Sequence, residues 1–102
     1  MSKPLSIADF DALTAWRRQG DGLARGRIER ALVFRSFQDA FAFMTEVAAL
    51  AEDQDHHPDW SNSYNRVNIS LTSHDVKALT QRDLDLANGI DTIAMRYAQK
   101  QH

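Results

Sequence analysis

Three of the four histidines fall within nineteen residues of the sequence, at His56, His57 and His74. Imidazole titrates near neutral pH and can donate or accept a proton, so histidines that share a pocket suit general acid and base catalysis. Carboxylates crowd around the first two histidines, and any that lie close to an imidazole favour its protonated form. They are Glu52, Asp53, Asp55 and Asp59.

Joint action of these histidines requires the chain to turn back on itself. In one extended strand His56 and His74 would lie about 60 Å apart, too far to share a ligand. Asn65 is midway between them and tolerates turn conformations, so we expect a hairpin there. Trp60 and Tyr64 lie in the same stretch and, on spacing alone, fit core or interface aromatics.

Each of these charged residues also has a plain structural explanation. His-His-Pro at 56–58 can follow a helix as a C-terminal cap, where cations meet the negative end of the dipole, and composition alone favours that explanation. His74 and Asp75 can be a solvated loop pair. Asp83 can accept hydrogen bonds from the backbone at a helix start.

Two other kinds of chemistry are less well supported. Three histidines and several carboxylates could bind zinc, but adjacent His56 and His57 lack the i, i+4 spacing of helical zinc sites. Nucleophilic catalysis is not supported either, because the sequence has no serine in a nucleophile-elbow motif and no cysteine. The absence of cysteine also excludes disulfides and thiolate metal sites.

Three capping-box patterns predict the starts of three helices. They are Ser6 with Asp9, Ser36 with Asp39, and Thr80 with Asp83. Apolar residues follow each start at helical spacing. They are Ile7, Phe10, Leu13 and Trp16; Phe37, Phe41, Met44, Ala48 and Ala51; and Leu84, Ala87, Ile90, Ala94 and Tyr97.

The second of these helices is apolar over more than one stripe, because Ala40, Phe43, Val47 and Leu50 lie beside the first set. We therefore expect it to bury a second face against another helix or another subunit. In the third helix, Gly89 costs about 1 kcal/mol relative to Ala, so packing must hold that helix.

Strand patterns fill the remaining segments. Glycines at 20, 22 and 26, followed by apolar residues from Ile28 to Phe34, indicate a hairpin. Val67, Ile69 and Leu71 alternate with polar residues, as in a half-buried strand. The order of helix, two strands, helix, one or two strands and helix predicts an α+β fold with helices on one face of an antiparallel sheet.

The 102 residues are 43% hydrophobic and 25% charged, which predicts one domain over 1–102. A net charge of −2 argues against nucleic-acid binding by bulk electrostatics. Apolar runs are far shorter than the ~20 residues that span a bilayer. The N-terminal residues lack an apolar signal-peptide stretch, so we expect a cytoplasmic protein.

The spacing of these residues resembles the signature of pterin-4a-carbinolamine dehydratases. The matching positions are Glu52, His56-His57-Pro58, Trp60, Tyr64-Asn65, Ser73-His74-Asp75 and Asp83. The likeness covers about residues 5–95 and includes Arg30, Phe34, Phe37, Phe41, Val47, Ala48 and Ala51, and Leu79-Thr80. Ser73 replaces a common Thr and Ala78 a common Gly, and neither change removes a proton-transfer group.

The resemblance implies a four-stranded antiparallel sheet with three helices packed on one face. It implies an enzyme that eliminates water from 4a-hydroxytetrahydropterin to give the quinonoid dihydropterin, for recycling after aromatic amino-acid hydroxylation, with no metal or organic cofactor. Homodimers or homotetramers through helix packing are implied as well. A role as a non-enzymatic dimerisation cofactor, or one near molybdenum-cofactor metabolism, stays open as an alternative.

Site residues follow from the same resemblance. It implies His56 and His74 as the proton-transfer pair, without saying which is the acid, and His57 as a pterin-holding or assisting group. Asp83 is expected to bond a histidine or the pterin. The residues implied in substrate binding are Glu52, which orients a histidine, Trp60, which forms a pocket wall, and Pro58, Ser73, Asp75 and Val76.

Overall fold

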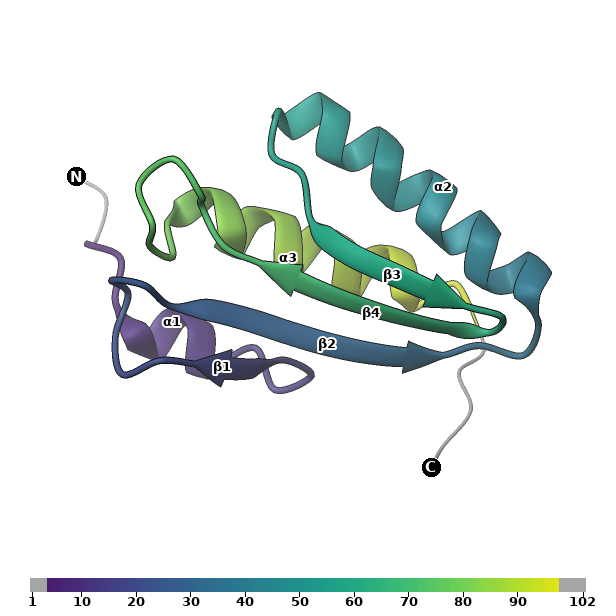
Figure 1. Cartoon of the computed structure of the whole chain (residues 1–102), viewed down its shortest axis with the longest axis horizontal. Helices are drawn as coiled ribbons and strands as arrows, with labels where there is room; N and C mark the ends of the chain where they lie inside the picture. The colour runs from purple at the N-terminus through teal and green to yellow at the C-terminus, as the bar shows by residue number, and fades with distance from the viewer. Residues whose placement is uncertain (1–3, 98–102) are drawn as a thin grey trace.

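The computed structural model describes residues 4–97, which form one antiparallel sheet with three helices (Figure 1). In chain order the elements are α1 (Ile7–Asp11), β1 (Arg17–Gln19), β2 (Arg27–Val33), α2 (Phe37–Gln54), β3 (Asp59–Ser63), β4 (Arg66–Leu71) and α3 (Gln81–Ala94). The strands lie in the order β1-β2-β4-β3. The predicted α+β class is confirmed. No helix within 4–97 is long and apolar enough to cross a bilayer.

The core lies between one face of the sheet and the helices α2 and α3. In β4, Val67, Ile69 and Leu71 are buried while Arg66 and Asn68 are exposed, which is the alternation that the sequence predicted. Successive side chains of a strand point to opposite faces, so only one face receives the helices. Burial of each such aliphatic side chain is worth roughly 1.5–3 kcal/mol.

Helix α2 begins as predicted, with the Ser36 hydroxyl accepting from the backbone N–H of Asp39 at 3.1 Å. Its core face draws on both sets of apolar residues that the sequence shows, and mainly on the second set. The buried residues are Ala40, Phe43, Val47 and Ala51. A helix that is apolar on several sides does not reveal by pattern which side meets the core.

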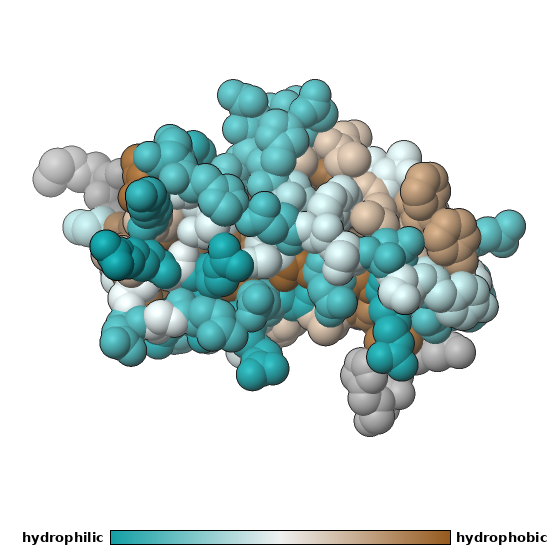
Figure 2. Space-filling model, viewed as in Figure 1, coloured by the Kyte–Doolittle hydropathy of each residue, from teal (hydrophilic) through white to brown (hydrophobic). Residues whose placement is uncertain are grey.

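The opposite side of α2 carries the stripe that begins at Phe37 and Phe41. These side chains are 45% and 57% exposed, and their rings stack with centroids 5.8 Å apart. Figure 2 shows hydrophobic side chains gathered near the start of α2, at the right of the view, whereas the exposed sheet face is mainly hydrophilic. Within a single chain this apolar surface therefore faces solvent.

Gly89 lets α3 approach α2 closely. A Cβ at this position would lie 2.4 Å from Cδ2 of Leu50, so a larger residue would push the helices apart or displace Leu50. The helix-weakening glycine is thus explained by packing, as the sequence analysis expected.

Helix α1 is shorter than predicted. It ends at Asp11, so Leu13 and Trp16 lie beyond it. Trp16 leads directly into β1 and is buried, and its indole N–H donates to Asp91 on α3 at 2.8 Å. That tertiary hydrogen bond, together with the strand that follows, fixes Trp16 outside the helix.

The hairpin between β3 and β4 turns at Tyr64 and Asn65, which confirms the turn expected near Asn65. The backbone carbonyl of Asn65 accepts from the backbone N–H of Phe34 at 2.7 Å, and the side-chain amide of Asn65 donates to the Phe34 carbonyl at 3.0 Å. Asp59 pairs with Ser70, so the segment after β4 returns to the end of α2. The chain between His56 and His74 is therefore folded back on itself.

We expect Gly26→Ala to destabilise the protein by about 1–3 kcal/mol. A Cβ at this position would lie 2.5 Å from the backbone carbonyl oxygen of Gly22, which cannot rotate away as a side chain can. Gly22→Ala is the matched control, since nothing lies within 4 Å of its Cβ position. Urea denaturation of both variants measures the difference, and equal midpoints would contradict this packing argument.

Candidate active site

One hollow brings together all three histidines of the described chain. Its lining residues come from the end of α2, the segment after β4 and the first turn of α3. They are Asp55, His56, His57, Thr72, His74, Asp75 and Arg82. The two histidine segments, separate in sequence, thus face a common space.

Asp83 lies at the centre of the buried part of this site and is fully inaccessible to solvent. One carboxylate oxygen lies 2.6 Å from Nε2 of His56, which is itself buried. The other accepts from the Ser73 hydroxyl at 2.8 Å and from the backbone N–H of Thr80 at 2.9 Å. The helix cap and the histidine contact, considered above as rival roles, are filled by the same carboxylate.

The two exposed histidines have carboxylate partners of their own. Nε2 of His57 lies 2.5 Å from a carboxylate oxygen of Glu52 on the last turn of α2. Nε2 of His74 lies 2.7 Å from a carboxylate oxygen of Asp59 at the start of β3. Asp59 therefore bonds His74 and not His57, although His57 lies only two residues before it in the sequence.

The end of α2 separates His56 from His57. Asp55 takes the left-handed conformation (φ 52°) that commonly ends a helix, and the backbone N–H of His56 then donates to the Ala51 carbonyl at 3.0 Å. After this turn the side chain of His56 is buried against Asp83, whereas His57 is exposed.

The loop after β4 is held by an exposed ion pair. Arg82 donates to Asp75 at 2.7 Å, and this hydrogen bond is the main reason why the pKa of the Asp75 carboxyl lies below its usual value and that of Arg82 above its own. Asp75 therefore stays ionised over the whole neutral range. Nothing in the sequence marks Arg82 as part of the site except its position one residue before Asp83.

Four residues that the resemblance implied in substrate binding lie outside the histidine hollow. Ser73 holds Asp83, Val76 is exposed, and Pro58 is half-buried; none of them lines the histidine hollow. Trp60 does not wall this hollow either. It packs against the core, because consecutive strand residues point to opposite faces and Asp59 takes the side of His74. On the edge strand β3, Trp60 also borders a separate groove.

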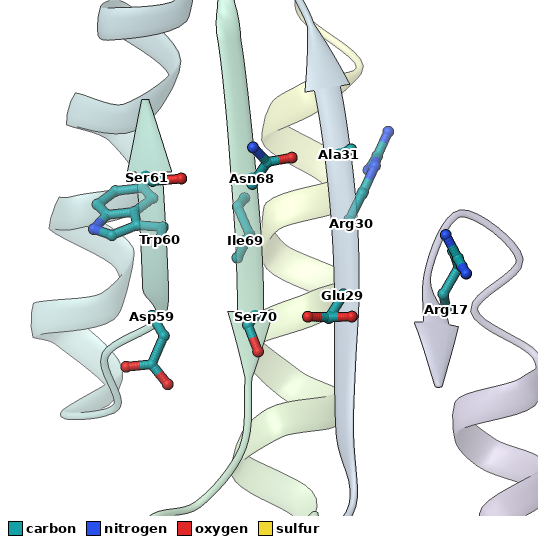
Figure 3. Close-up of a pocket in the computed structure, with 10 residues that line it drawn as sticks. All are labelled: Arg17, Glu29, Arg30, Ala31, Asp59, Trp60, Ser61, Asn68, Ile69 and Ser70. Carbon is teal, nitrogen blue, oxygen red and sulfur yellow. The ribbon is translucent and has the colours of Figure 1, made fainter. Parts of the chain in front are cut away.

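That groove follows the exposed face of the sheet (Figure 3). A polar row crosses it through paired residues of all four strands, Arg17, Glu29, Ser70 and Asp59. Asp59 thus borders this groove and also binds His74. Within residues 4–97 no group of three or more His, Asp or Glu side chains is arranged to hold a metal ion.

Comparison with known proteins assigns the chain to a family. Residues 3–93 match the family model described as pterin 4 alpha carbinolamine dehydratase. A relative from Prochlorococcus marinus (strain MIT 9313) is 46% identical over 93 residues, which are 91% of this chain and 97% of the relative. One from Synechococcus sp. (strain WH7803) is 54% identical over 68 residues, 67% of this chain and 73% of the relative. Both names assign this dehydratase activity provisionally.

Two solved structures share the fold. The crystal structure of a transcriptional coactivator/pterin dehydratase from Brucella melitensis has a TM-score of 0.76 and 38% identity, and the match covers 85% of this chain and 89% of that one. A pterin dehydratase-like protein identified as a RuBisCO assembly factor in the alpha-carboxysome has a TM-score of 0.66 and 27% identity, covering 78% and 89%. With the matched family model, these findings show that the chain belongs to the pterin-4a-carbinolamine dehydratase family.

Proposed function

We propose that this protein eliminates water from a 4a-hydroxytetrahydropterin by general acid and base catalysis from its histidines. The observation that carries the proposal is the shared hollow lined by His56, His57 and His74. Membership of the dehydratase family supports the same reaction.

The reaction needs only proton transfers. A proton is added to the 4a-hydroxyl oxygen, the C4a–O bond breaks and water leaves. The N5–H bond breaks as its proton passes to a base, and its electron pair forms the C4a=N5 double bond. One proton is delivered and one is removed, so imidazoles in two protonation states suffice.

Each carboxylate contact prepares an imidazole for this task. In neutral histidine one ring nitrogen carries hydrogen and the other a lone pair. A carboxylate beside Nε2 favours hydrogen there and leaves the lone pair on Nδ1. His56 with Asp83 and His74 with Asp59 fit this arrangement, which makes Nδ1 the nitrogen that exchanges protons with the pterin.

Stopped-flow decay of freshly generated 4a-hydroxytetrahydropterin tests the proposal. We expect the protein to accelerate decay in proportion to its concentration, and a chelator to leave the rate unchanged. Elemental analysis of the purified protein checks the zinc alternative directly. Decay that is equally fast with and without protein would overturn the proposed activity.

Recycling of tetrahydropterin after aromatic amino-acid hydroxylation, in the cytoplasm, is the setting that we propose for this reaction, with a biopterin-type substrate. We further propose that the chain forms a homodimer or homotetramer through α2. The exposed pair Phe37 and Phe41 supports this, since a large apolar patch on a helix favours association.

A non-enzymatic interaction role is the second candidate. The exposed apolar side of α2 supports it, and so do the relatives described as a transcriptional coactivator and a RuBisCO assembly factor. Such a role should tolerate the loss of His56 and His74, whereas a dehydratase should not. Comparing binding and turnover in the same histidine variants separates the two.

A further inference from the structure

A second hollow adjoins the histidine hollow and is strongly basic. Its lining consists of Arg25, Gly26, Arg27, Thr72, His74 and Lys77. Thr72 and His74 line both hollows, so the two are neighbours across these residues. Two arginines, one lysine and no carboxylate line this space, although the whole chain carries a net charge of −2.

Hydrogen bonds between distant segments fix the backbone that carries the cationic side chains. The N–H of Arg25 donates to the Lys77 carbonyl at 2.7 Å, and both residues have positive φ, 59° and 52°. Thr72 donates its hydroxyl to the Gly26 carbonyl at 2.8 Å. The basic hollow is therefore a defined part of the fold rather than three unrelated side chains on a surface.

These cations are not neutralised by neighbouring carboxylates. Among residues 4–97, Arg25, Arg27 and Lys77 form no ion pair within 4.0 Å, although other basic residues do. The nearby carboxylates Asp59 and Asp75 are engaged by His74 and Arg82. Clustered cations of one sign in a concave surface concentrate a positive potential that attracts anions.

We propose that this hollow binds an anionic group, a phosphate or a carboxylate, on the side chain of a pterin whose ring lies in the histidine hollow. The inference rests on the proposed function for the position of the ring. His74 lies at the boundary, so its proton-transfer role and the basic hollow would act on the same ligand. Among the pterins that the histidine hollow accepts, those with an acidic side chain should then bind more tightly than those with a neutral side chain, such as a biopterin.

Calorimetric titration with matched stable pterins tests the inference. Neopterin and neopterin monophosphate share a ring and a side chain and differ by the phosphate. We expect the phosphate ester to bind about tenfold more tightly at low ionic strength, and the ratio to shrink when salt is raised. Folic acid, whose side chain ends in carboxylates, shows whether the hollow accepts that anion as well.

The double variant Arg25→Gln/Lys77→Gln removes two charges from the hollow. We expect it to bring the two neopterins to nearly equal affinity while leaving the dehydration rate of a neutral carbinolamine pterin unchanged. Arg35→Gln/Arg66→Gln is the charge-matched control. It removes two positive charges outside the basic hollow, from Arg35, which follows β2 and pairs with Asp39, and from Arg66 at the start of β4. The control should keep the tenfold preference.

The outcomes separate the two proposals. Equal affinity of the unmodified protein for both neopterins, together with normal dehydration of a neutral substrate, would overturn the basic-hollow inference and leave the proposed function intact. A preference that falls equally in the double variant and its control would also overturn the inference, because it would reflect net charge alone. Failure of every pterin to bind, with no dehydration, would overturn the proposed function.

Discussion

His74→Ala is expected to lower kcat for dehydration of 4a-hydroxytetrahydropterin by about 10²–10⁴-fold, the usual contribution of a positioned proton-transfer group. The fold should survive, since the His74 side chain is 64% exposed and makes its side-chain hydrogen bond to Asp59. Surface substitutions of this kind usually change the free energy of unfolding by no more than ~0.5 kcal/mol. Stopped-flow kinetics and urea denaturation on the same preparation measure both quantities.

Ser61→Ala is the control for His74→Ala. Ser61 is exposed on β3, two residues along from Asp59, and lies outside the histidine hollow. Its turnover and stability should match the unmodified protein. If His74→Ala dehydrates the pterin as fast as Ser61→Ala does, His74 has no part in the mechanism.

Asp83→Ala is expected to reduce both stability and turnover. Removing the carboxylate leaves the buried His56 ring, the Ser73 hydroxyl and the Thr80 N–H without this acceptor, although Ser73 and Thr80 still contact each other. Loss of one member of a buried polar network, together with the loss of the helix cap, lowers the free energy of unfolding by about 2–5 kcal/mol. Urea denaturation measures this loss, and kcat falls because His56 is no longer oriented.

Two comparisons separate the network from a general effect of charge removal. Asp85→Ala removes an exposed carboxylate from the same helix, where it only accepts from Gln81, and should cost no more than ~0.5 kcal/mol. In a His56→Ala background, Asp83→Ala should cost less than it does alone, because the contact is already gone. Additive costs in this cycle would contradict the coupling of Asp83 to His56.

The sequence by itself determined the order of the helices and strand regions, but not where α1 ends or whether one or two strands follow α2. Capping residues Ser36 and Thr80 mark helix starts because their side chains bond backbone groups only a few residues away. Alternation in β4 and the turn at Asn65 are likewise local signals, since strand geometry and turn conformation depend on neighbouring residues. The resemblance to a family then added the expected reaction.

Only the tertiary structure decided which groups meet. Asp83 reaches His56 across 27 positions of the chain, and Asp59 reaches His74 across 15, although Asp59 lies much closer in sequence to His57. The same holds for the basic hollow, where Arg25 and Lys77 meet through a backbone hydrogen bond between distant loops. Spacing along a chain fixes local conformation, but contacts between distant segments depend on how the packed helices and sheet bring those segments together.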